Sequence, residues 1–256
     1  MALEPGAEAL IFLALLFAVA LDLDQVGYHF TIISGKNISY RNCFSRASAA
    51  GTIEHDNGSV TDQLFLSIWL EQHRRANRLQ SFEKLLRLFP FSQRSQPQST
   101  ISVQAVGTTE PPLLEQAVNG PFDVSEVMAF LRDFSGDDLA YRIESWWDLW
   151  QYDADWILRP ARVVLSCLGP EFDNGSEWTG AGQEDLRIDF GVDTCYLPQP
   201  EMTGGGKLIE SNVKSLLRLV HELDSALPVE KRKLETESGD NFAEKLKQAA
   251  TASRIQ

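Results

Sequence analysis

Cysteine, histidine and methionine are scarce in this sequence, whose 256 residues contain three cysteines, four histidines and three methionines. The cysteines, Cys43, Cys167 and Cys195, are too few and too widely spaced for a disulfide scaffold or a structural zinc site. The histidines lie far apart, and none belongs to an HExxH pattern. We therefore expect neither a metal ion nor a cofactor.

Positive charge is also scarce. The sequence contains 23 Lys and Arg but 36 Asp and Glu, which gives a formal net charge of -13. Bases outnumber acids only in residues 60–94, by six to three, whereas residues 95–256 hold 27 acids and 14 bases. Nucleic-acid binding requires clustered Lys and Arg, so we expect no DNA or RNA partner. We interpret the bases of residues 60–94 as a solvated helix face.

No apolar run is long enough for a comfortable membrane span. The longest, Ala9–Leu21, has 13 residues and as a helix would measure only about 20 Å. Residues 18–20 read Ala-Val-Ala, as at a signal-peptidase site, but Glu4 and Glu8 precede the run where a signal has Lys or Arg. A signal or anchor and a buried helix or start-site extension both stay open. We favour the second, with a cytoplasmic body that meets a membrane only through this segment.

Composition and linkers divide the chain into four ranges. Its 43% hydrophobic and 23% charged residues are typical of a folded protein. We expect an apolar segment at 1–24, a strand, loop and long helical region at 25–94, an α+β core at 95–228, and a charged tail with a short helix at 229–256. A Ser, Gln and Pro-rich linker marks the internal boundary.

The range before this linker is dominated by a helical pattern. A β-branched run at His29–Ser34 predicts a strand. Apolar residues then recur at helical spacing between Leu64 and Phe89, after Ser59 as an N-cap and before Pro90 as a stop. Because residues 72–78 are polar on every side, one long helix and two shorter ones both stay open.

The core range contains several strand patterns and two helix patterns. Strands are predicted over 100–106, 113–118, 139–150, 157–168 and 186–196, and helices over 123–134 and 211–227. Only residues 151–155 separate the third and fourth strands, which predicts a hairpin. The strands occur in runs rather than in alternating βα units. We therefore predict an α+β fold, with a mostly antiparallel sheet and helices packed on one face.

Four of the six tryptophans lie in residues 144–156, which read ESWWDLWQYDADW. Alternate residues of a strand share a face, so one face would carry carboxylates and indole rings in turn. Tryptophan beside acids is typical of surfaces that bind proteins, sugars or cations. The expected binding residues are Trp146, Trp150 and Trp156.

The acids of the same segment are candidates for catalysis, namely Glu144, Asp148, Asp153 and Asp155. A retaining glycosidase needs two carboxylates about 5 Å apart. Glu144 and Asp148 would lie about 13 Å apart along a strand, but an acid across the hairpin could be closer. The structural alternative has the aromatic residues in the sheet core and the acids paired with neighbouring arginines, which are Arg142, Arg159 and Arg162.

Two functions stay open from the sequence. We favour a non-catalytic protein that binds another protein through its acidic sheet or Trp-rich hairpin, because no catalytic motif is present. The glycine run at 204–206, for example, lacks the spacing of a Walker A loop. The alternative is a hydrolase or carbohydrate-binding enzyme that uses the acids of the hairpin.

Overall fold

The computed structural model describes residues 62–71, 73–94, 98–120, 122–173, 183–197 and 205–246. The apolar run Ala9–Leu21 and the strand predicted at His29–Ser34 lie outside the described residues. Within the described part of the chain, no helix has the length and apolar character that crossing a membrane requires.

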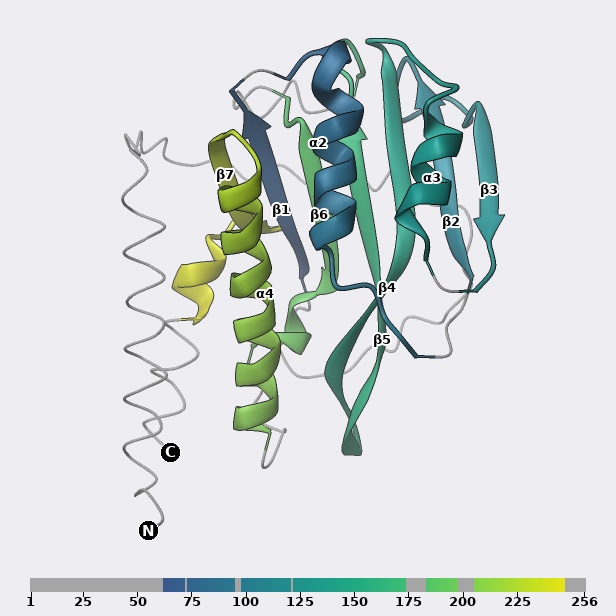
Figure 1. Cartoon of the computed structure of the whole chain (residues 1–256). Helices are drawn as coiled ribbons and strands as arrows, with labels where there is room; N and C mark the ends of the chain where they lie inside the picture. Colours follow the sequence, from purple (N-terminus) through teal and green to yellow (C-terminus); the bar gives the residue numbers. More distant parts are fainter. Residues whose placement is uncertain are drawn as a thin grey trace.

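A seven-stranded sheet forms the centre of the protein, and every neighbouring pair of strands is antiparallel. Across the sheet the order is β3 (Leu114–Val118), β2 (Ser99–Ala105), β4 (Leu139–Asp153), β5 (Asp155–Leu168), β6 (Leu186–Val192), β1 (Gln63–Leu70) and β7 (Val229–Thr236). The helices α2 (Arg75–Leu88), α3 (Val124–Leu131) and α4 (Gly206–Ala226) lie on one face (Figure 1). A short 3-10 helix, η2 (Asp193–Cys195), follows β6. The predicted α+β fold is confirmed.

The hydrophobic core lies between the sheet and these helices. Along β4, buried residues alternate with half-buried ones, so that Ile143, Trp147 and Leu149 point toward the helices. Helix α4 contributes a stripe at helical spacing that includes Val213 and Leu216. Burial of apolar area on one side of the sheet is therefore the main stabilising contribution.

Strands β4 and β5 form a long hairpin that extends beyond the rest of the sheet (Figure 1). Their pairing is continuous from Ala140 opposite Leu168 to Asp153 opposite Asp155. The turn between them is Ala154, whose φ is 61°. The predicted hairpin is therefore present, with strands longer than expected because the polar residues 151–153 belong to β4.

The prediction of a helix is wrong for the first part of the helical region, because residues 63–70 form strand β1. Leu64, Leu66 and Ile68 are buried and alternate with residues of the opposite face, a period of two that fits a strand. Strand β1 pairs with β6 on one side and β7 on the other. The helical pattern begins only at α2.

Three further boundaries differ from the prediction. The charged tail begins with strand β7, an edge strand whose Lys231 and Lys233 protect it from further pairing. Helix α4 begins at Gly206, five residues before the predicted start at Ser211. The strand predicted to end at residue 196 turns into η2 after Val192.

Candidate functional site

We call the side of the sheet opposite to the helices the open face. None of the described helices packs against it (Figure 1). Its long charged side chains reach solvent, since Glu144, Arg162 and Arg187 are 33%, 49% and 38% exposed, whereas Ser67 and Val164 between them are buried. By strand alternation and register, the residues of this face include Phe65, Ser67, Thr100, Ser102, Arg142, Glu144, Trp146, Trp150, Arg162, Val164, Ser166, Arg187, Asp189, Lys233 and Glu235.

Two rows of opposite charge run across the open face from β2 to β7, whereas on β3 the acid Glu115 stands opposite Ser102 of the basic row. The basic row consists of residues that stand opposite one another on successive strands, which are Ser102, Arg142, Ser166, Arg187, Ser67 and Lys233. The acidic row lies two residues further along the same strands and consists of Thr100, Glu144, Val164, Asp189, Phe65 and Glu235. Each row therefore carries a charge on β4, β6 and β7, with neutral residues on the strands between.

Most of these charges have partners within the chain. Arg162 donates to Glu144 at 2.6 Å, and this hydrogen bond lowers the pKa of Glu144. Arg187 pairs with Glu184 at 2.9 Å, and its guanidinium lies 4.1 Å from the centre of the Phe65 ring. Lys233 pairs with Glu235 at the sheet edge.

Arg142 differs from these arginines. Within the described part of the chain, no hydrogen bond or ion pair of its guanidinium is found. Burial lowers the pKa of Arg142 from its ordinary value, and Arg162 lowers it further, against the opposing effect of Glu144. A half-buried guanidinium of this kind has donors to offer to an acceptor from outside the chain.

The three predicted binding tryptophans occupy different environments. Trp146 lies on the open face, where its Nε1 donates to the Gln98 carbonyl at 3.5 Å. Trp150 is half-buried on the same side of the hairpin. Trp156 packs on the hydrophobic core and on Tyr152, with ring centres 5.5 Å apart. It also covers the backbone of Gly205, where an added Cβ would lie 1.8 Å from Cζ2 of Trp156. We therefore assign Trp156 a packing role.

The candidate catalytic acids are held by neighbouring groups. Glu144 pairs with Arg162, and Asp153 pairs with Arg159 at 3.2 Å. Asp148 accepts hydrogen bonds from the Ser92 hydroxyl at 2.6 Å and from the Gln93 amide at 3.3 Å. Asp155 lies opposite Asp153 at the exposed end of the hairpin. The two Arg pairs are those that the structural alternative expects.

The interpretation of the basic residues between 60 and 94 as a solvated helix face is wrong for Arg78 and for the nearby His73. Arg78 is 1% exposed and donates to the Tyr141 hydroxyl at 2.8 Å. His73 has a 4% exposed side chain, and its Nε2 lies 2.8 Å from the Leu168 carbonyl and 3.9 Å from Asp185. Both residues bind the ends of strands β4 and β5 to helix α2 and the loop before it.

This buried cluster contains the residue types of a cysteine nucleophile site without its chemistry. Burial raises the pKa of the Cys167 thiol far above its ordinary value. The charge of Arg78 lowers this pKa and the charge of Asp185 raises it, both by less than burial does. Nucleophilic cysteines need a lowered pKa and access to substrate, so Cys167 is a packing residue.

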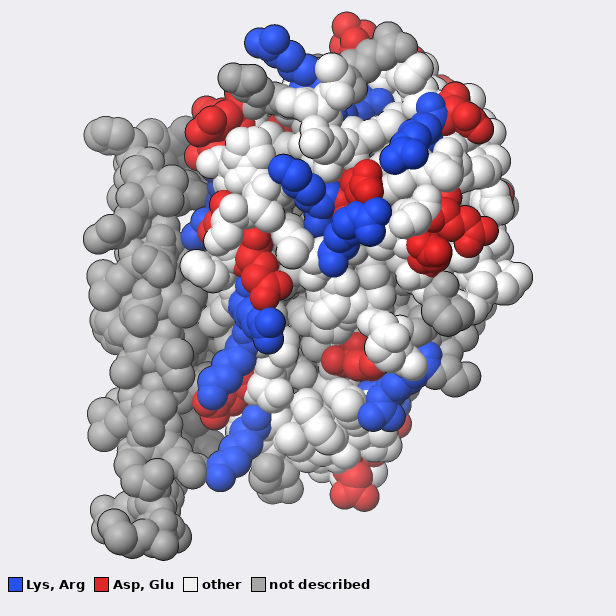
Figure 2. Space-filling view, viewed as in Figure 1, with Lys and Arg blue, Asp and Glu red and all other residues white. Residues whose placement is uncertain are grey.

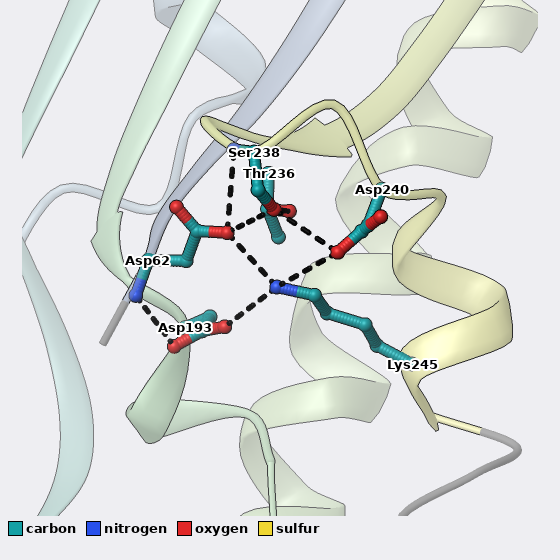
Figure 3. Close-up of polar contacts among 6 residues, drawn as sticks. All are labelled: Asp62, Asp193, Thr236, Ser238, Asp240 and Lys245. Carbon is teal, nitrogen blue, oxygen red and sulfur yellow. Dashed lines mark hydrogen bonds and ion pairs between the residues drawn. The ribbon is translucent and has the colours of Figure 1, made fainter. Parts of the chain in front are cut away.

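A second polar cluster anchors the C-terminal part of the chain (Figure 3). Lys245 lies 2.9 Å from Asp62, 3.6 Å from Asp193 and 3.8 Å from Asp240. Burial alone would lower the pKa of Lys245, but the hydrogen bond to Asp62 and the neighbouring carboxylates raise it. A lysine that stays protonated cannot act as a base for Ser238, whose hydroxyl and backbone amide both donate to Asp62. The cluster is a clamp between β1, η2 and the end of the chain.

The helix-covered side of the molecule carries charge in a different arrangement. Figure 2 shows basic and acidic side chains next to one another over the helices. Several are ion pairs between residues four apart, which are Arg87 with Glu83, Lys214 with Glu210, and Arg218 with Glu222. Such exposed pairs contribute little to stability, and these three join residues of a single helix rather than forming rows across elements.

The sequence predicted Trp146, Glu144 and Trp150 on one strand face but missed the rows. The signal was a base followed two residues later by an acid, at Arg142, at Arg187 and at Lys233. It could be detected only with the strand register known.

No group of His, Cys, Asp and Glu among the described residues could hold a metal ion. Protein-family models, curated proteins and solved structures gave no match to the chain.

Proposed function

We propose that this protein is a non-catalytic binding protein whose open face binds another protein. The observation that carries the proposal is the composition of this face, where Trp146 stands opposite Arg162 on the side of the sheet that no described helix covers. Tryptophan and arginine are enriched among the residues that dominate binding free energy at protein interfaces.

The location of Trp146 and Trp150 supports a binding role for these two residues. Neither belongs to the hydrophobic core, whereas the adjacent Trp147 is 4% exposed and packs against Phe89 and Phe190. Each indole is half-buried, so it is held in place by the hairpin while part of its ring stays accessible. Pre-positioned aromatic rings bind at low cost in conformational entropy.

The contacts of the acids favour binding over hydrolysis. A general acid that works near neutral pH needs a raised pKa. The hydrogen bond from Arg162 lowers the pKa of Glu144 instead. Asp148 accepts a hydrogen bond from Ser92 and Asp153 accepts one from Arg159, so both carboxylates are engaged within the chain.

The test compares a variant of the open face with a variant of the helix side. The double substitution Trp146→Ala and Trp150→Ala should lower partner recovery at least tenfold in affinity capture from expressing cells, quantified by mass spectrometry. Arg218→Ala is the matched control, because Arg218 is 80% exposed on α4, and it should leave recovery unchanged. Circular dichroism must show that both variants fold. Equal recovery by the folded double variant and the control would contradict the proposal.

A further inference from the structure

We propose that the partner of the open face is a second copy of this chain, docked by a two-fold axis that runs between the basic and acidic rows. The inference rests on the proposed function, because it names the partner of the same face. It is carried by the geometry of the two rows.

The rows are parallel and evenly spaced. Strands β4, β6 and β7 run in the same direction, because each is antiparallel to the strand between it and the next. Each presents a base and, two residues later, an acid on the same face: Arg142 and Glu144, Arg187 and Asp189, Lys233 and Glu235. The rows therefore lie about 7 Å apart along the strands, and charges of like sign follow one another at about 10 Å.

Such a pattern is complementary to itself. Rotation by half a turn about an axis in the plane of the face, parallel to the rows and midway between them, places the basic row of one copy over the acidic row of the other. Arg142 then faces Glu144 of the second copy, Arg187 faces its Asp189, and Lys233 faces its Glu235. This is the isologous contact of a two-fold dimer, in which each residue pair occurs twice.

The half-buried Arg142 fits this arrangement. Its guanidinium has no ion pair among the described residues, while Arg162 bonds only the Oε2 atom of Glu144 in the contacts found. The second carboxylate oxygen of Glu144 is thus available to the Arg142 of a second copy. An unrelated partner would need an acidic and a basic row at the same spacing. A second copy has both rows at this spacing because its sequence and fold are the same.

The size of the face sets the expected affinity. From β4 to β7 the overlap extends over four strand spacings, about 19 Å, and along β4 it extends about 20 Å between Ala140 and Trp146, which the axis brings opposite each other. Trp150 lies beyond this overlap. The contact falls at the lower end of specific interfaces, below about 1,200 Å² in total. A net charge of -13 on each chain also opposes association. We therefore expect a dimer that dissociates on dilution.

The first measurement is the mass of the full chain in solution by sedimentation equilibrium, at about 0.15 M salt, where the Debye length is about 8 Å. A mass that rises from monomer to dimer between micromolar and hundreds of micromolar protein is expected. A monomer throughout this range would overturn the inference.

Charge-reversed variants then locate the contact. Lys233 and Glu235 lie on an edge strand, 48% and 22% exposed, so reversal should preserve the fold, which thermal unfolding can verify. Lys233→Glu alone should weaken self-association at least tenfold, because two acidic positions meet, and Glu235→Lys alone should do the same, because two basic positions meet. An equimolar mixture of the two variants should restore a dimer, since the glutamate introduced in one chain would meet the lysine introduced in the other. Absence of dimer in the mixture would overturn the proposed contact.

A second variant tests the other end of the rows. Arg142→Gln removes one charge while keeping a polar side chain, and we expect it to raise the dissociation constant about fivefold or more. An unchanged constant would contradict the role of Arg142. The outcome is separable from the proposed function: a chain that stays monomeric yet captures another protein through Trp146 and Trp150 retains that function and loses only this inference.

Discussion

The two faces of the sheet differ sharply although the same strands form both. The covered face is mainly apolar, and on β4 it carries Ile143, Trp147 and Leu149. The buried Ser145 of the same face is hydrogen-bonded to Ser99. The open face of the same strand carries Arg142, Glu144 and Trp146. An antiparallel sheet can have one side in contact with water, which fits the position of the described helices on one face of the sheet.

The difference separates residues needed for folding from residues available for contact. Side chains on the covered face exclude water against α2, α3 and α4, so their loss leaves a cavity. Side chains on the open face are partly hydrated in the isolated chain, so their replacement costs less stability. Adjacent residues of one strand should therefore differ greatly in their sensitivity to substitution.

The strongest test of this comparison uses neighbouring tryptophans on opposite faces. Trp147→Ala should lower the free energy of unfolding by about 3–5 kcal/mol, because the ring packs on Phe89 and Phe190 in the core. Trp146→Ala should lower it by about 1 kcal/mol or less. Urea unfolding followed by circular dichroism measures both. Equal losses would show that the open face is part of the core.

The sequence predicted those parts of the fold that local patterns determine. Helix α3 begins at Val124, directly after the expected capping residue Asp123, which accepts a hydrogen bond from the Ser125 amide at 2.8 Å. The β4–β5 hairpin was predicted from apolar alternation with few intervening residues. Strand β1 was missed because Phe65 and Trp69, which face the opposite side from Leu64, extend the apolar pattern and resemble helical spacing over a short window.

The candidate site depended on information that no local pattern contains. Strand alternation placed Glu144 and Trp146 on one face, and this part was predictable. The rows require the register of β4, β6 and β7, which come from distant parts of the chain and are aligned only by pairing across the sheet. The burial of Arg78 was equally unpredictable, because its acceptors lie on another element.

Two adjacent glycines test whether Trp156 belongs to the packed side of the molecule. A methyl group on Gly205 would overlap the indole of Trp156, whereas a Cβ on Gly206 would meet nothing within 4 Å. We expect Gly205→Ala to lower the free energy of unfolding by about 2 kcal/mol. Gly206→Ala, the matched control, should leave it unchanged or raise it by up to about 1 kcal/mol. Similar values for the two variants would place Trp156 away from the start of α4.

The smallest expected effect concerns the clamp at the sheet edge and depends on pH. Although burial alone would raise the pKa of Asp62, hydrogen bonds from Ser238 and Lys245 outweigh it and lower the pKa from 3.8 to about 2. A carboxylate with a lowered pKa in the folded state stabilises the fold above pH 3.8 and loses this contribution as the pH falls toward 2. Asp62→Asn should therefore cost about 1 kcal/mol at pH 6, and the cost should shrink as the pH approaches 2. Asp193, whose pKa burial raises, also responds to the charge of Asp62, so the difference between the two proteins reports the coupled pair of carboxylates rather than Asp62 alone. Urea unfolding of both proteins at several pH values measures this difference, and a constant gap would show that Asp62 stabilises the clamp by packing rather than by its charge.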